Sequence, residues 1–382
     1  FKQGYARGVA QAKGTTMGQG KVSVAAIQTG SGATKQVERS VLFLGQAPEN
    51  NGSILPINAQ SDFDDLFGAA DSPLKTQIKA WQRNGDDLVS GYAIPHGAGD
   101  DVMGLIDEAM DQDISPEIIV ICTPVTGKAE IESYQAKALE ILSGQSRYVR
   151  FLLAAPGLTP EQNWSDLVTA LQPLTDGVVG ERVAVIPLLF GDELGGVTGR
   201  LCKSSVTIAD SPMRVLTGAM SLMPLPKDKA GKPLTNSTTA ALDAQRFSCT
   251  QFYPDFDGVY FGDVNMLDAE GGDFQKIEIG RIVDKAARAV RIIGIQNVKN
   301  RRLNNSSTGI EFGKRIMGKP LRDMARSVNI GADKFPGLID APKDDSINLT
   351  FMDATTLQVV LKVKPIDSPS TIIVGIMLDN AE

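Results

Sequence analysis

Strand-like and helix-like patterns alternate between residues 37 and 200, and this alternation constrains the fold more than any other feature of the chain. The strand-like runs are short and almost wholly apolar, which is typical of strands buried on both faces. The helix-like runs carry apolar residues three and four positions apart. We assign strands to residues 41–44, 117–122, 149–155 and 183–189, and helices to residues 61–67, 73–81, 101–110, 128–142 and 160–171. This order predicts an α/β fold: an open, mostly parallel sheet with helices on both faces.

Several helix boundaries are suggested by capping residues. Ser61 or Asp62 is expected to cap the first helix, and Thr159 the helix at 160–171, because their side-chain oxygens can accept hydrogen bonds from free backbone N–H groups. Ser143-Gly144 is expected to end the helix before it. The clearest helix of the chain lies within residues 271–298, with Asp273 as its expected cap.

The remaining chain changes character several times. Residues 1–36 are rich in glycine and small polar residues, and such a segment cannot bury enough apolar surface to offset its own ordering entropy. A second helical stretch is expected at residues 310–317, with Pro320 allowing a kink or a new start. We divide the chain into an N-terminal arm (1–36), an α/β domain (37–200), an irregular connecting or outer region (201–256), an α+β core domain with basic helices (257–345) and a β-rich C-terminal segment and arm (346–382).

Charge is distributed unevenly along the chain. Residues 276–326 hold 13 Lys and Arg against four Asp and Glu, so this segment is about +9 and the rest about −16, given −7 for the whole. A basic block on an acidic protein favours head-to-tail attraction between copies, or an acidic partner. The alternative is a solvated helix face. Nucleic acid is not an expected partner, since the block lacks interleaved aromatic residues and the whole chain is acidic.

Motifs for catalysis are weak. The single histidine, His96, follows Ser90 and precedes Asp100 and Asp101, which permits a hydrolase triad, but a Gly/Pro turn that contains a histidine explains the same residues. No phosphate-binding loop, dinucleotide fingerprint or calcium loop has the required spacing. We expect no catalytic residues, no cofactor and no metal. The alternative that stays open is an α/β enzyme using residues 37–200, supported by the strand–helix alternation alone.

The three cysteines, Cys122, Cys202 and Cys249, are widely spaced and odd in number. They argue against a disulfide framework or a zinc site and fit a reducing cytoplasm. No secretory signal and no apolar run of roughly 20 residues is visible, so we expect no direct membrane insertion.

One stretch carries a family resemblance. It runs from Asp257-Gly-Val-Tyr-Phe-Gly-Asp-Val-Asn265 through the double glycine Gly271-Gly272 and the basic helix Arg281-Ile-Val-Asp-Lys-Ala-Ala-Arg288 to Gly318-Lys-Pro-Leu-Arg-Asp-Met324. This order of aromatic strand, glycine break, basic helix and Pro-interrupted basic segment resembles the C-terminal core of contractile tail sheath proteins. The resemblance is specific over about 250–330 and looser over the α/β portion.

The resemblance implies extended N- and C-terminal arms that add strands to the sheets of adjacent subunits. The N-terminal arm strand would lie at residues 22–27, and the C-terminal one at 357–363 or 371–378. The arm residues would be Val22, Val24 and Ile27 at one end, and Leu357, Val359, Leu361, Val363, Ile372, Val374 and Ile376 at the other.

The same resemblance implies the partners. They would be further copies in a helical homopolymer of stacked hexameric rings, a tail tube protein, and baseplate and tail terminator proteins. The expected place is the virion tail, after assembly in the bacterial host cytoplasm; a tailocin or secretion-system sheath stays open. Basic residues would face an acidic tube: Lys314, Arg315, Lys319, Arg322 and Arg326, with Arg281, Lys285, Arg288 and Arg291 as contacts between subunits.

Overall fold

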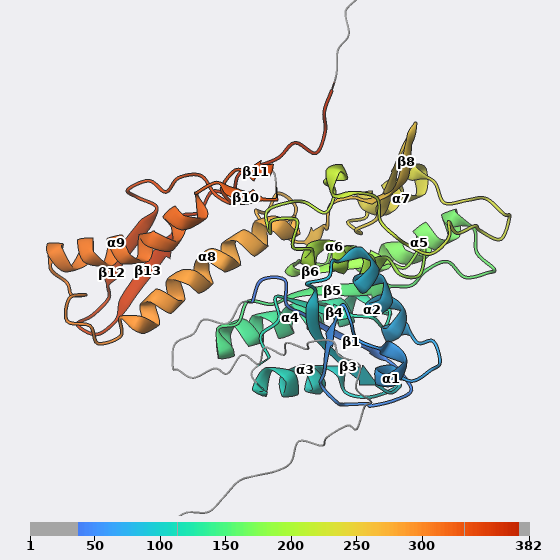
Figure 1. The fold of residues 1–382 in the computed structure, drawn as a ribbon, viewed down its shortest axis with the longest axis horizontal. Coiled ribbons are helices and arrows are strands. Elements are labelled where there is room, and N and C mark those ends of the chain that lie inside the picture. Colours follow the sequence, from blue (N-terminus) through green and yellow to red (C-terminus); the bar gives the residue numbers. More distant parts are fainter. Residues whose placement is uncertain (1–36, 113, 332, 374–382) are drawn as a thin grey trace, which may run out of the picture. The chain divides into compact units, whose positions relative to one another are not determined.

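A seven-stranded, mostly parallel sheet forms the centre of the computed structural model, which describes residues 37–373 apart from residues 113 and 332 (Figure 1). The strand order is β2-β3-β1-β4-β5-β6-β9, with β2 and β9 antiparallel at the two edges and the others parallel. The strands are β1 (Val41–Gln46), β2 (Leu55–Asn58), β3 (Ser90–His96), β4 (Ile118–Ile121), β5 (Arg150–Ala155), β6 (Gly180–Pro187) and β9 (Met266–Leu267). The predicted open, mostly parallel sheet is therefore confirmed.

Helices cover both faces of this sheet, because its strands are apolar on both sides. In β1, Leu42 and Leu44 enter one hydrophobic core and Val41 and Phe43 enter the other. The first core also receives side chains from α3 (Val102–Asp111), α4 (Lys128–Gln145), α5 (Trp164–Thr175) and α7 (Asn236–Ala244). The second receives side chains from α1 (Phe63–Phe67), α2 (Pro73–Asn84) and α6 (Glu193–Cys202).

Helices α2 and α6 pack unusually close together through glycines. A Cβ atom on Gly195 would lie 1.9 Å from the carbonyl oxygen of Gln77, and one on Gly199 would lie 2.4 Å from that of Trp81. Gln77 also joins the helices directly, since its Oε1 accepts a hydrogen bond from the Gly195 N–H at 2.8 Å. Glycine is thus required here by close approach rather than by turn geometry.

The capping predictions have mixed outcomes. Asp62 caps α1 as predicted, accepting from the N–H groups of Asp64 and Asp65. The Thr159 prediction is wrong: α5 begins at Trp164, and Asn163 with Asp166 forms a capping box. The prediction for the end of α4 is also wrong, because the helix continues through Ser143-Gly144 to Gln145 and Ser146 adopts the left-handed conformation.

The C-terminal half contains long helices and small two-stranded sheets. In α8 the predicted cap is wrong: the helix starts at Ile277 after Lys276, not at Asp273. In α9 the chain continues as a helix through Pro320. The elements are the 3₁₀ turn η1 (Val215–Thr217), β7 (Thr250–Tyr253), β8 (Phe256–Phe261), α8 (Ile277–Gln296), α9 (Ser307–Met324), β10 (Val328–Ile330), β11 (Asp333–Phe335), β12 (Ile347–Phe351) and β13 (Leu357–Leu361).

A third hydrophobic core joins α8, α9 and the hairpin β12–β13. It contains Ile282 of α8, Leu321 of α9 and Leu349 of β12. Two glycines of α9 allow the hairpin to approach: a Cβ on Gly313 would lie 2.7 Å from Leu349, and one on Gly318 would lie 2.9 Å from Ile347. Along the described part of the chain, no helix has the length and apolar character needed to cross a membrane.

Candidate interaction surfaces

A buried ion pair fixes α8 to the central sheet. Arg281 donates from Nε to Oε1 of Glu117 at 2.8 Å and from Nη2 to Oε2 at 2.9 Å. Glu117 stands directly before β4, and its Oε2 also accepts from the backbone N–H of Arg39 at 2.6 Å. Arg281 is only 1% exposed. The prediction that it faces a tube or a neighbouring subunit is therefore wrong.

A second buried cluster lies one helical turn further along α8. Asp284 accepts from Arg150, at the start of β5, at 2.9 Å and from Arg182 of β6 at 3.1 Å. A Cβ on Gly280 would lie 2.1 Å from the Arg150 guanidinium carbon, so this position of α8 must be glycine for Arg150 to reach Asp284. Charged residues at the amino-terminal ends of β4, β5 and β6 thus fix the first half of α8 through ion pairs.

Electrostatics keep the Glu117–Arg281 pair ionised. Burial raises the pKa of the Glu117 carboxyl, but the Arg281 guanidinium, the backbone N–H of Arg39 and the charge of Arg288 together more than offset this effect, and the pKa lies below its usual value of 4.5. Burial lowers the pKa of Arg281, and the Glu117 carboxylate again outweighs it, so this pKa is raised. A buried pair of this kind fixes the position of α8 relative to the sheet. Separating the two groups would leave a buried charge without a partner, which is costly.

The hairpin β12–β13 changes the interpretation of the C-terminal arm. Leu357, Val359 and Leu361 pair with β12 of the same chain, and their side chains contact the third core together with Val363. The prediction of residues 357–363 as an exchanged arm is therefore wrong, whereas 371–378 stays a prediction. Ile372 is 78% exposed. The other arm residues, Val22, Val24, Ile27, Val374 and Ile376, lie outside the described residues.

The outer edges of this hairpin have no partner strand within the described residues, since β12 and β13 form a sheet of two strands. Unpaired edges present rows of free backbone N–H and C=O groups that can accept a further strand. Val360 of β13 is 46% exposed. The hairpin is therefore a platform, held in place by α8 and α9, to which strands from outside could add.

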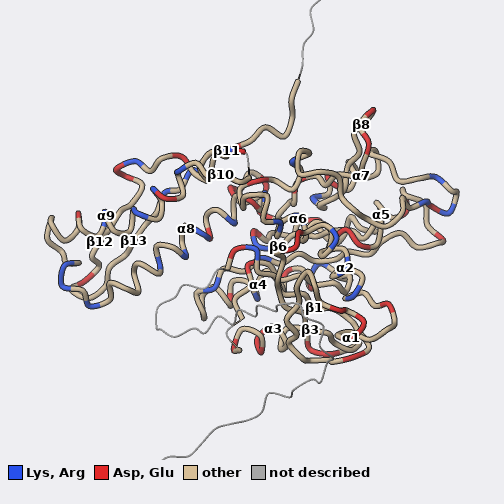
Figure 2. Tube along the Cα trace, viewed as in Figure 1, with Lys and Arg blue, Asp and Glu red and all other residues tan. Residues whose placement is uncertain are grey.

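Basic residues recur along α9 (Figure 2). Arg315, Lys319, Arg322 and Arg326 are exposed, and Lys314 is half-buried. Asp323 pairs with Lys319 at 2.8 Å and with Arg326 at 3.2 Å, so part of this charge is neutralised within the helix. The structure places Lys314, Arg315, Lys319 and Arg322 on α9 and Arg326 just after its C-terminal end, and it does not identify what they face.

A polar cavity of about 630 Å³ lies beside this basic helix. It is lined by Lys314, Arg315 and Arg322 of α9 and by Lys343 from the loop before β12, with Glu311 and Asp344 as the acidic lining residues. The excess of positive charge suits an acidic group of a partner.

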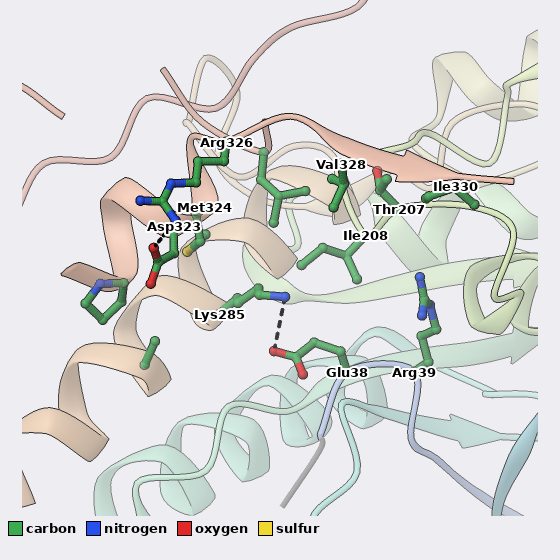
Figure 3. Close-up of a pocket in the computed structure, with 13 residues that line it drawn as sticks. Glu38, Arg39, Thr207, Ile208, Lys285, Asp323, Met324, Arg326, Val328 and Ile330 are labelled. Carbon is green, nitrogen blue, oxygen red and sulfur yellow. Dashed lines mark ion pairs between the residues drawn. The ribbon is translucent and has the colours of Figure 1, made fainter. Parts of the chain in front are cut away.

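The remaining predicted basic residues lie on α8. Lys285 and Arg288 both pair with Glu38, at 3.9 and 3.1 Å. Burial raises the pKa of Glu38, but these two cations outweigh it and the pKa is lowered. Figure 3 shows Glu38 and Lys285 facing each other in a largely apolar pocket of about 480 Å³. Arg291, by contrast, is exposed.

The residues considered for catalysis are not brought together. Ser90 and His96 stand at the two ends of β3, about 20 Å apart at strand spacing. His96 Nδ1 contacts the carbonyl oxygen of Gly97 at 2.9 Å, while Asp101 caps α3. Cys122, Cys202 and Cys249 are buried and free. Within residues 37–373, gaps excepted, no group of three or more His, Cys, Asp or Glu side chains could hold a metal ion.

Known proteins match the chain along most of its length. The family model described as DUF2586, N-terminal domain, matches residues 19–265, and DUF2586, C-terminal domain, matches residues 273–381. A protein of Haemophilus phage HP1 (strain HP1c1) named "Putative tail sheath protein" is 37% identical over 367 residues, which are 94% of this chain and 97% of that protein.

Solved structures share the fold over almost the whole chain. The sheath complex of PVC, an extracellular contractile injection system, in its contracted state has a TM-score of 0.63 at 12% identity and covers 96% of this chain and 99% of its own. The baseplate of the anti-feeding prophage contains a chain with a TM-score of 0.59 at 12% identity, covering 95% and 100%. At 12% identity these similarities show a shared fold and nothing more.

Proposed function

This chain belongs to the DUF2586 family, and we infer that it is a structural subunit of a contractile tail sheath, in a phage tail or a related contractile injection system. The observation that carries this conclusion is 37% identity to the phage protein named "Putative tail sheath protein", over nearly the full length of both chains. The fold shared with contractile sheath structures agrees with it. Nothing supports the α/β enzyme alternative, and we propose a non-enzymatic role.

Copies of the subunit are proposed to assemble into a helical polymer, as stacked hexameric rings, by exchanging strands. The support is the hairpin β12–β13, which has open outer edges in the described structure and is anchored on α8 and α9. Residues 22–27 and 371–378 are the proposed incoming strands. Heterologous contacts of this kind do not close on themselves, so they build helices.

Contraction is proposed to move rigid bodies that stay linked by these strands. The buried pairs of α8 support this view, because they tie the C-terminal core to the sheet at several points. Main-chain hydrogen bonds between subunits would persist while the bodies rotate. The energy would be stored at assembly as a metastable extended packing, so no nucleotide is required.

The basic face of α9 is proposed to contact an acidic tail tube protein. Arg315, Lys319 and Arg322 are exposed on it, Arg326 is exposed just after its C-terminal end, and Lys314 borders the basic cavity beside it. Lys285, Arg288 and Arg291 are the proposed alternatives for contacts between subunits. Baseplate and tail terminator proteins would bind the two ends of the sheath. Its place would be the virion tail, after assembly in the bacterial host cytoplasm.

Negative-stain microscopy of the purified protein tests the proposal. A sheath subunit is expected to form rings or long tubes whose length grows with protein concentration. A small closed oligomer at every concentration and salt tested would instead favour the enzyme alternative.

A further inference from the structure

An acidic cavity lies beside the first turn of α8. Its volume is about 750 Å³, and its walls come from residues 209–215, from the start of α8, and from the C-terminal segment 365–372. The acidic lining residues are Asp210, Asp263, Glu278 and Asp367, against the basic residues Arg214 and Lys276. Apolar side chains such as Ile279 and Phe335 complete the lining.

Most of these charges already have partners. Lys276 pairs with Asp263 at 2.5 Å, the guanidinium of Arg214 lies 4.9 Å from the centre of the Phe335 ring, and Asp210 accepts from the Thr207 N–H at 2.6 Å. Glu278 differs, because its Oε2 is shielded from solvent and has no hydrogen-bond partner in the described structure. A carboxylate in that position lacks a donor, and supplying one would be favourable.

The electrostatic state of Glu278 points the same way. Burial raises its pKa to about 7, with Asp263 adding to the rise, even though Lys276 and Arg281 act against it. An additional cation in the cavity would stabilise the ionised form.

A segment with complementary charge exists in the chain itself. Residues 1–36 contain Lys2, Arg7, Lys13, Lys21 and Lys35 and no Asp or Glu. The basic helices α8 and α9 would repel such a segment, whereas the acidic cavity would attract it. Thirty-five residues can span roughly 115 Å when extended. A unit of about 350 residues has a radius of gyration of about 20 Å, so the segment is long enough to reach a second copy.

We propose that this cavity receives a lysine side chain from residues 1–36 of a neighbouring copy, with Glu278 as its counter-ion. The proposal rests on the sheath function, and it adds a charged anchor to the main-chain pairing suggested there. The apolar lining would contact the methylene stem of the incoming side chain, as long basic side chains commonly bury their stems.

Zero-length crosslinking tests the contact. Full-length ¹⁴N- and ¹⁵N-labelled proteins are mixed, assembled and treated with a water-soluble carbodiimide, which joins a carboxylate to a lysine amine in direct contact. Mass spectrometry is expected to find mixed-isotope peptides that link Glu278, Asp367 or Asp210 to Lys2, Lys13, Lys21 or Lys35. Arm lysines joined only to other acids, only within one copy, or not crosslinked at all would overturn the proposal.

A charge-removal variant gives a second readout. Glu278→Gln is expected to raise the protein concentration needed for polymerisation by roughly tenfold or more, as expected for the loss of a charged hydrogen bond. Glu132→Gln, which removes the same charge from an exposed position of α4, serves as the control and should change little. Equal effects of the two variants would refute the anchor. If wild-type protein polymerises without these crosslinks, only the anchor fails; if it never polymerises, the sheath function fails as well.

Discussion

Glu117 and Arg281 lie 164 residues apart in the sequence and form a bidentate ion pair with both side chains almost fully buried. One residue precedes a central strand and the other belongs to α8, so the pair joins the sheet to the C-terminal core. Removing one partner leaves an uncompensated charge in the interior, which costs far more than loss of an exposed pair.

Arg281→Met is therefore expected to lower the free energy of unfolding by about 3–5 kcal/mol. Urea unfolding of the unassembled protein measures this, with Arg291→Met as an exposed control on the same helix that should change stability by about 0.5 kcal/mol or less. The double variant Glu117→Leu/Arg281→Met should recover part of the loss, because no charge then stays unpaired. A single variant as stable as wild type would show that the pair does not form.

The acid sensitivity of the fold should depend on the same pair. The folded pKa of Glu117 lies below its usual value of 4.5, so its contribution to stability is complete above pH 4.5 and is lost as the pH falls through the lower, folded value. Wild-type stability should drop more steeply than that of Glu117→Gln between pH 4.5 and lower values. Urea midpoints measured across this range compare the two slopes, and parallel curves would contradict the assignment.

Much of the sheet could be predicted from the sequence, because buried parallel strands are continuous apolar runs. The run at 149–155 matches β5, Arg150–Ala155, within one residue. The sequence does not predict β3, because Gly91 and Pro95 are residues typical of turns. In the structure a Cβ on Gly91 would lie 2.6 Å from the carbonyl oxygen of Val41, so the close approach of β3 to β1 requires that glycine. The sequence does not predict helix α6 for a similar reason, because its glycines lower helix propensity while allowing α2 to pack against it.

The interaction surfaces were predictable only in part. Counting charges located the basic block, but composition does not distinguish the buried Arg281 from the exposed Arg291 ten residues later. Their difference depends on Glu117, which no local pattern links to α8. The hairpin shows the same limit: Leu357 and Val359 have the apolar alternation of an arm strand, and their pairing with β12 depends on the third core.

Deleting residues 371–382 is expected to leave the subunit folded while abolishing polymerisation. Ile372 and Ile373 are 78% and 91% exposed, so the subunit body loses few contacts with them. Circular dichroism checks the fold and electron microscopy checks assembly. Tubes of ordinary length from the shortened chain would exclude residues 371–378 as an essential arm.

Charge reversal on α9 is expected to separate tube binding from self-assembly. Lys319→Glu/Arg322→Glu alters two exposed residues on the basic face, and it should weaken co-sedimentation with tail tubes more than it weakens sheath polymerisation. Lys128→Glu, on the exposed side of α4, is the control. Similar losses in both assays would remove the assignment of α9 to the tube.

Glu278 provides the sharpest test, because its effects on stability and on assembly should have opposite signs. Burial raises its folded pKa to about 7 from 4.5, so the folded subunit loses stability as the pH rises from 4.5 to about 7. Glu278→Gln removes that loss and should stabilise the unassembled subunit at pH 8 by about 1–2 kcal/mol, after allowing for its partial exposure. Below pH 4.5 the two proteins should be equally stable. The same variant should polymerise less well, because the Glu278 carboxylate that destabilises the free subunit is the group that binds the neighbouring copy. Thermal unfolding in high salt and sedimentation in low salt measure the two effects, and a variant that is both less stable and less able to polymerise would point to simple structural damage.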